Sequence, residues 1–263
     1  MLSLPVVFVS HGAPDALLKA EDAVACWRDI GARLPAVKAI LAVSAHWQES
    51  RPTASLAAAP ETLHDFSGFA PELYRLHYPA PGAPALARRA QALLAAAGIE
   101  ADLHPERGLD HGAWVPLLAM QAQAQLPVTQ LSLAGGGPAA HWAIGRALAP
   151  LRDEGVLLLA SGGITHNFSW LDWGAGPQAE AYAPARAYAD WVAERLAQGD
   201  TAALLAYRET ADGAAAHPSE EHFLPLFVAL GAAPIVAPRR YRPRFTYGAL
   251  AMDAYVWEHG VWP

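Results

Sequence analysis

Three apolar segments of the chain each run directly into a histidine. The segments PVVFVS, AILAVSA and VLLLASGGIT lead to His11, His46 and His166. In a parallel α/β sheet the carboxyl ends of the strands share one edge, and ligands bind in the crevice there. Imidazole is the commonest metal ligand among protein side chains. The pattern therefore predicts a metal site at the carboxyl edge of the strands.

These histidines also have a structural interpretation. His11 would then be a core or capping histidine, and His166 would be the solvated flank of a turn formed by Gly162 and Gly163. However, His11 and His46 share one context, because each follows closely behind a serine at the end of an apolar run. This repetition favours the metal site for both.

The other histidines are expected to take different positions. Pro218 is typical of the first residue of a helix, so we expect His217 just before that helix and His222 one turn inside it. Helical rotation then separates the two rings, and His222, with Glu221 beside it, is the better donor. His111 is expected between a loop and a helix, where it either caps the helix or acts behind the metal ligands. Five more are assigned to the surface or to structural roles: His64, His77, His104, His141 and His259.

Composition limits both the compartment and the partner. The 263 residues include 53% hydrophobic side chains and carry a formal net charge of −7, so the chain lacks the basic footprint of a protein that binds nucleic acid or an anionic membrane. A small neutral or organic partner fits better. Cys26 is the single cysteine, which predicts a cytoplasmic protein whose metal site uses His, Asp or Glu. The sequence shows no signal peptide and no apolar run of membrane-spanning length, so we expect a soluble protein.

The order of the elements predicts one α/β domain over residues 1–263. Strand-length apolar runs alternate with helical patterns, which indicates a mainly parallel central sheet flanked by helices on both faces. The aromatic loop 61–81 is too long for a plain connection and is expected to be functional. The expected strands or extended segments are 6–9, 38–45, 54–59, 100–103, 128–133, 156–160 and 246–257. The expected helices are 15–33, 84–97, 114–123, 141–151, 178–197 and 219–228.

Motifs for two other kinds of chemistry are incomplete. Ser10, Ser44 and Ser161 do not lie in a Gly-x-Ser-x-Gly elbow, so a serine hydrolase is disfavoured. The glycines at 135–137 lack the lysine of a P-loop and the spacing of a dinucleotide fingerprint, and we interpret them as a turn. What remains is a site with several imidazoles and at most one carboxylate, which suits Zn(II) or non-haem Fe(II).

Seven sequence blocks, in one order over nearly the whole chain, resemble the DOPA 4,5-dioxygenase branch of the class III extradiol ring-cleaving dioxygenases. They are SHGAP at 10–14, SAHW at 44–47, HDFSGF with ELY at 64–74, YPAPG at 78–82, LDHGAW at 109–114, SGGITHN at 161–167 and HPSEEHFLPL at 217–226. Any one block is weak evidence, whereas seven in order are specific. The resemblance implies an iron(II) enzyme that uses O₂ to open the ring of a DOPA-like catechol beside its hydroxyls, giving a muconic semialdehyde-type product.

The resemblance also implies roles for individual residues. The metal ligands of the family match His11, His46 and His222. His166 matches an acid–base histidine, which some members place close enough to the metal to count as a fourth ligand. His111 matches a histidine near the substrate and oxygen. The wider class has a carboxylate where this branch has His222, which keeps Glu221 as a reserve candidate, and an all-histidine site also holds Zn(II).

Aromatic residues flank these blocks and would wall a flat pocket for a ring. We take Trp47, Phe66 and Trp114 as candidate substrate contacts, although ordinary core packing explains each of them equally well. Residues 66–78 would act as a lid. A catechol with a charged side chain needs a pairing residue, and the sequence gives no basis for choosing among Arg75, Arg239, Arg240, Arg242 and Arg244.

Two other classes of function remain open at this point. The first is a Zn(II)-dependent hydrolase or chelatase-like enzyme, because zinc suits imidazole ligands. The second is a non-catalytic metal-binding protein on the same scaffold. The presence of His11, His46, His166 and His222 together argues against a loss of catalysis.

Overall fold

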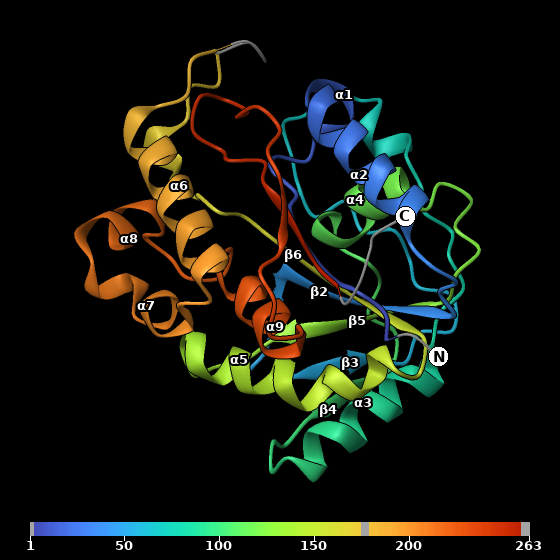
Figure 1. Cartoon of the computed structure of the whole chain (residues 1–263). Helices are drawn as coiled ribbons and strands as arrows, with labels where there is room; N and C mark the ends of the chain where they lie inside the picture. The colour runs from blue at the N-terminus through green and yellow to red at the C-terminus, as the bar shows by residue number, and fades with distance from the viewer. Residues whose placement is uncertain (1–2, 175–178, 259–263) are drawn as a thin grey trace.

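A sheet of eight strands forms the centre of the molecule in the described part of the chain (Figure 1). The computed structural model describes residues 3–174 and 179–258. The strand order is β4-β3-β5-β2-β6-β1-β8-β7. The strands are β1 (Val6–Ser10), β2 (Ala39–Gln48), β3 (Thr53–Ser55), β4 (Asp102–His104), β5 (Val128–Leu133), β6 (Val156–Gly162), β7 (Arg239–Tyr241) and β8 (Ala254–Trp257).

Parallel pairing dominates the middle of the sheet. β5, β2, β6 and β1 are joined in parallel, as are β3 and β4. β3 pairs with β5, β8 with β1 and β7 with β8 in antiparallel register. The carboxyl ends of β2, β6 and β1 therefore lie side by side at one edge, where a ligand site is expected in an open α/β sheet.

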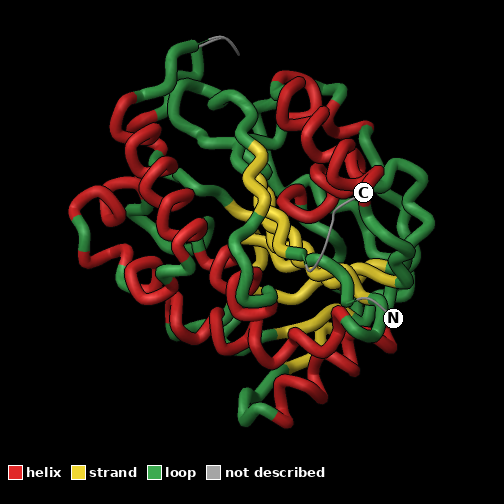
Figure 2. Tube along the Cα trace, viewed as in Figure 1, coloured by secondary structure: helices red, strands yellow, loops and turns green. Residues whose placement is uncertain are grey.

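Helices cover both faces of the sheet (Figure 2). One face is covered by α1 (Ala16–Lys19), α2 (Glu21–Arg33) and α4 (His111–Met120). The other is covered by α3 (Pro84–Ala96), α5 (Gly137–Leu148) and α9 (Leu224–Ala232). This second layer is extended by α6 (Ala183–Gln198), α7 (Thr201–Leu205) and α8 (Ala211–Ala216). None of the helices described here is both long and apolar enough to cross a membrane.

Residues of the central strands alternate between two buried apolar layers. Val6 and Phe8 of β1 pack in the layer of α3, α5 and α9, whereas Val7 and Val9 pack in the layer of α2 and α4. All four side chains are buried. Because both faces are covered, the strand reads in the sequence as a continuous apolar run. The predicted α/β class, with a mostly parallel sheet between helical layers, is confirmed.

Element boundaries differ from the prediction where the backbone turns locally. The predicted helix 15–33 is broken at Ala20, whose φ of −104° and ψ of 61° separate α1 from α2. The predicted strand 246–257 is wrong over its first part. Tyr247 and Gly248 have positive φ angles of 51° and 68°, and they form a tight turn that leaves only Ala254–Trp257 as β8. β7, α7 and α8 are short elements that the sequence patterns do not predict.

Candidate metal centre and its cavity

Three histidine rings from distant parts of the chain converge beside the central strands. His11 directly follows β1, His46 lies near the end of β2, and His222 lies in the turn before α9. The Nε2 atoms of His11 and His46 are 3.0 Å apart. One ring nitrogen from each of the three histidines lies within 4.8 Å of the other two. Imidazole nitrogens at this spacing form a donor set for one metal ion.

His222 reaches this cluster from a turn and not from a helix. Because α9 begins at Leu224, the prediction that Pro218 opens a helix with His222 inside it is wrong. The buried His217 directs its Nε2 to the carbonyl oxygen of Ile164, 2.9 Å away and outside the cluster. The two histidines are separated as expected, but the path of the turn separates them.

Partners on the far side of the rings orient the cluster. Nδ1 of His11 lies 2.9 Å from Oγ of Ser161, and Nδ1 of His222 lies 3.0 Å from Oε1 of Glu221. Such partners fix the orientation and tautomer of a ligating imidazole and leave its other nitrogen for the metal. The sequence does not reveal Ser161 as a partner of His11, because their contact depends on the pairing of β1 with β6.

Gly112 of α4 allows a helix backbone to lie directly against the cluster. A β-carbon at this position would lie 2.3 Å from Oγ of Ser44, 3.0 Å from Cδ2 of His46 and 3.2 Å from Cε1 of His11. Only glycine avoids these contacts. The glycine of the LDHGAW block is thus explained by the close approach of α4 to two candidate ligands.

Burial keeps the three imidazoles neutral. It lowers the pKa of His11 and of His222 well below the usual value, and neighbouring histidines lower both further. Burial, followed by the proximity of His111, lowers the pKa of His46 to about 3. A histidine must be unprotonated to bind a metal. The charge state of the donor set therefore fits a divalent transition metal.

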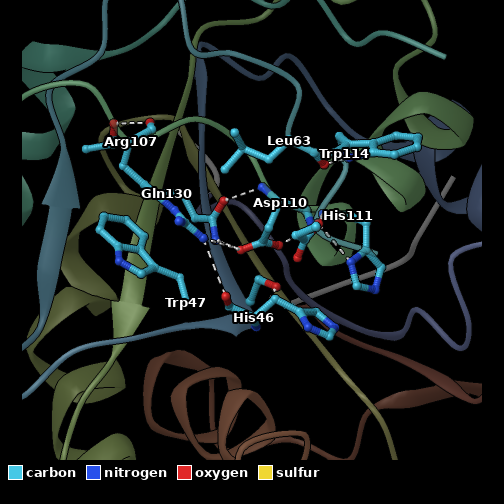
Figure 3. Close-up of polar contacts among 12 residues, drawn as sticks. His46, Trp47, Leu63, Arg107, Asp110, His111, Trp114 and Gln130 are labelled. Carbon is cyan, nitrogen blue, oxygen red and sulfur yellow. Dashed lines mark hydrogen bonds and ion pairs between the residues drawn. The ribbon is translucent and has the colours of Figure 1, made fainter. Parts of the chain in front are cut away.

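His111 begins α4 and lies against the cluster (Figure 3). Its ring centroid is 3.9 Å from that of His46. Oδ1 of Asp65, in the loop 61–81, accepts a hydrogen bond from the backbone N–H of His111 at 2.9 Å and lies 3.0 Å from its Nδ1. Burial alone would raise the pKa of Asp65, but the contacts with His111 lower it to about 2. The carboxylate therefore stays charged and holds Nδ1, which leaves Nε2 of His111 for other partners.

A buried polar network behind His46 is absent from the sequence-based predictions (Figure 3). Asp110 caps α4 by accepting a hydrogen bond from the N–H of Ala113 at 3.2 Å, and the side-chain amide of Gln130 donates to its other oxygen. Arg107 donates to the carbonyl oxygen of His46 at 3.4 Å. An aspartate directly before a helix is a capping signal that could have revealed Asp110. Gln130 carries no such signal, because its role depends on the register of β5.

His166 follows β6 and lies against the ring of His222. The two rings stack, with centroids 3.3 Å apart and 7° between their planes. Nδ1 of His166 is buried without a hydrogen-bond partner among the described residues and lies 3.9 Å from Oε1 of Glu221. Glu221 thus lies on the Nδ1 side of both rings. With His166 and His222 it forms a second group of donor atoms within 4.8 Å of one another.

A cavity of about 430 Å³ opens onto these rings. Phe66 lines it, whereas Trp47 and Trp114 lie in the packing behind it. The indole N–H of Trp47 donates to Glu49 at 2.9 Å, and that of Trp114 donates to the carbonyl oxygen of Leu63 at 2.8 Å. Of the three aromatic candidates, Phe66 is therefore the one that the structure places in the cavity wall, and its contact with a substrate stays a prediction. Four histidines and Ser67 form the polar part of the described wall, and the histidines are His46, His111, His166 and His222.

Comparison with known proteins agrees with this arrangement. Residues 5–248 match the family described as the catalytic LigB subunit of aromatic ring-opening dioxygenase. The chain belongs to this family. It is 41% identical over 235 residues to the 4,5-DOPA dioxygenase extradiol of Beta vulgaris, with 86% of this chain and 85% of that protein covered. The same-named protein of Escherichia coli K12 is 39% identical over 233 residues, with 87% and 85% covered.

A solved structure supports the fold of this LigB-family protein. The crystal structure of an uncharacterized protein from Escherichia coli K12 superposes with a TM-score of 0.79 at 34% identity, over 97% of this chain and 99% of that one. The resemblance to the DOPA-dioxygenase branch of the extradiol enzymes is thereby confirmed. This LigB-family protein is an oxidoreductase of the extradiol, aromatic ring-opening class.

The contact between Asp65 and His111 gives a first prediction for this LigB-family enzyme. Asp65→Asn removes the charge that holds Nδ1 of His111 and should lower kcat by about tenfold to a hundredfold, with bound metal and KM nearly unchanged. Steady-state kinetics and metal analysis measure both. Asp172→Asn is the matched control, because Asp172 is exposed and, among the described residues, its side chain accepts a hydrogen bond only from the N–H of Gly174 in its own turn. Equal kcat values for Asp65→Asn and the wild type would contradict the positioning role.

Proposed function

We propose that this LigB-family enzyme is a non-haem Fe(II)-dependent extradiol dioxygenase that opens the ring of a catechol with O₂ to a muconic semialdehyde-type product. One observation carries the proposal: the neutral imidazoles of His11, His46 and His222 meet beside a cavity with aromatic walls. The names of the relatives, 4,5-DOPA dioxygenase extradiol, support a catechol as the substrate class.

The donor set fits the proposed ion. The buried imidazoles of His11 and His222 and the half-buried imidazole of His46 would hold it, and His46 and His222 also line the cavity. Bound Fe(II) would supply the path by which electrons pass from the catechol ring to dioxygen, since three protein ligands leave coordination positions open. Imidazole donors also suit Zn(II), so the identity of the metal is part of the proposal.

His166 and His111 are proposed to handle protons and charge at the reacting oxygens. The Nδ1 atom of His166 is buried, so Nε2 is the atom that exchanges protons with a molecule in the cavity. There it would take a proton from a catechol hydroxyl and later return one to a product oxygen. His111, held by Asp65 through Nδ1, would direct Nε2 toward the substrate and, when protonated, stabilise negative charge that develops on oxygen.

Reconstitution tests the proposal directly. The metal-free protein is loaded with Fe(II) under nitrogen and then mixed with catechol and oxygen. We expect one O₂ to be consumed per catechol, measured with an oxygen electrode. We also expect a yellow ring-fission product, measured by its absorbance. A parallel sample loaded with Zn(II) should be inactive in this assay. Turnover with Zn(II) alone and without oxygen uptake would instead favour a hydrolase.

A further inference from the structure

We propose that the catechol accepted by this cavity carries a neutral, apolar substituent, such as an alkyl or aryl group, and not a carboxylate-bearing chain like that of DOPA. This inference rests on the proposed function, because it specifies the substrate of the same site. It follows from the side chains around the four histidines and from the positions of the charged residues near them.

The part of the wall beyond the histidines is mainly apolar, with Ser67 as its one polar side chain among the described residues. Two of its aromatic side chains come from the loop 61–81, and the rest come mainly from the segment after β6. The larger aromatic and aliphatic side chains around the cavity are those of Phe66, Phe69, Phe168, Leu171, Trp173 and Leu250. A substituent that extends from a ring seated at the histidines would contact these groups, and such contact favours apolar over charged chemistry.

Phe168 and Trp173 form an aromatic rim at this cavity. The ring of Phe168 lies edge-on to that of His166, with centroids 4.9 Å apart, and its centroid is 6.4 Å from that of Trp173. Phe168 is 65% exposed and Trp173 is 52% exposed, which is unusual for side chains of this size. A bound apolar substituent would cover both, so the exposed rim is explained by a ligand that leads outward from His166.

Lysine and arginine are missing from the described wall of the cavity. The described residues that line the cavity include no lysine and no arginine, and residues 1–2, 175–178 and 259–263 contain neither type. Five arginines were candidates, from the sequence, to pair with a charged substrate. Each of them has an acidic partner outside the cavity wall. The pairs are Arg75 with Glu72, Arg239 with Glu258, Arg240 with Asp253, Arg242 with Asp190 and Arg244 with Asp22.

Two carboxylates contact the side chains of wall residues. Asp65 contacts His111 and Glu221 contacts His222, whereas Arg107 contacts the backbone carbonyl oxygen of His46 and does not line the cavity. Lys19, which contacts Tyr247 beside Trp173, is ion-paired with Asp15 at 2.8 Å. A substrate carboxylate would lose its hydration in the cavity without gaining a cation, and it would be repelled by the nearby acidic side chains. A neutral substituent avoids both costs.

Substrates that differ in the charge of one substituent test this inference. 4-Propylcatechol, 3-(3,4-dihydroxyphenyl)propionate and dopamine each carry a substituent with a three-atom backbone, and these substituents are neutral, anionic and cationic. With the Fe(II)-loaded enzyme we expect kcat/KM for 4-propylcatechol to exceed that for the propionate and for DOPA by at least about tenfold, with dopamine between them. Cleavage of DOPA or the propionate as fast as 4-propylcatechol would overturn the inference, and so would a preference for dopamine.

Binding to the metal-free protein provides a second readout that does not depend on turnover. Calorimetric titration under nitrogen should show tighter binding of 4-propylcatechol than of the propionate. If no catechol is cleaved but this order of binding holds, the proposed function fails and the assigned ligand class stands. If catechols are cleaved but the order is reversed, the ligand class fails and the proposed function stands.

A substitution in the aromatic rim tests whether the rim contacts the substituent of the catechol. Phe168→Ala should lower kcat/KM for 4-propylcatechol by about fivefold to tenfold more than it lowers that for unsubstituted catechol, since only the substituent reaches the rim. Tyr182→Ala is the matched control, because Tyr182 is another exposed aromatic residue, at 46%, and does not line the cavity. Equal losses on both substrates would contradict the assignment of Phe168 to the substituent.

Discussion

His222→Ala should reduce bound metal from about one ion per chain to less than about a tenth, and ring cleavage by at least about a thousandfold. The substitution removes one of three imidazoles whose donor atoms lie within 4.8 Å of one another. His11 and His46 alone leave a weaker, two-ligand site. Metal analysis after dialysis and oxygen uptake with catechol measure the two effects.

His217→Ala is the control that separates binding from folding. His217 is buried and its Nε2 bonds to the carbonyl oxygen of Ile164. Its loss leaves that carbonyl unpaired and should lower the free energy of unfolding by about 1–3 kcal/mol, while metal content and kcat stay near the wild-type values. A His222→Ala protein that keeps full metal occupancy would contradict the proposed ligand set and favour the group of His46, Asp65 and His111, whose donor atoms also lie within 4.8 Å of one another.

His166→Ala should give the opposite combination, a protein that retains its metal and loses turnover. Removal of a general acid–base group lowers kcat by about a hundredfold to ten-thousandfold. Because the stacked ring of His166 is removed next to His222, added imidazole should restore part of the activity. Metal analysis, kcat and the dependence of kcat on imidazole concentration check the prediction.

The comparison residue for His166→Ala is His104, which ends β4 and does not line the cavity. His104→Ala should leave turnover and metal content unchanged, with or without imidazole. If His166→Ala loses metal together with activity, His166 is a fourth ligand and a different group must carry the proton.

The periodicity of the sequence predicts much of this fold for a physical reason. Central strands such as Val6–Ser10 and Val156–Gly162 are buried on both faces, so their apolar runs are unambiguous. Edge elements carry weaker signals. β7 is three residues long and partly exposed, and the segment around Tyr247 reads as a strand although its backbone turns. Local backbone geometry of this kind depends on tertiary contacts that no pattern along the chain reports.

For the site, the sequence predicts donor types better than it predicts their partners. The ends of the strands and the family resemblance predict His11, His46 and His222 as metal ligands, and their rings lie together in the structure. The contacts that Asp65 makes with His111 and Ser161 makes with His11 are not predicted, because the two residues of each pair are far apart in the sequence. Trp47 and Trp114 show the converse limit. An aromatic residue next to a motif either faces the cavity or packs behind it, and only the structure distinguishes the two.

The separation of the proposed ligands along the chain would couple metal supply to folding. His11 follows the first strand and His222 precedes the last long helix, so an ion bound between them ties together segments near opposite ends of the polypeptide. The unfolded chain offers no such arrangement, and a ligand that binds only the native state adds about 4 kcal/mol of stability at a thousand times its Kd. The ion would therefore stabilise the native fold by linking these two segments. Its removal by a chelator would lower the unfolding temperature as well as stop catalysis.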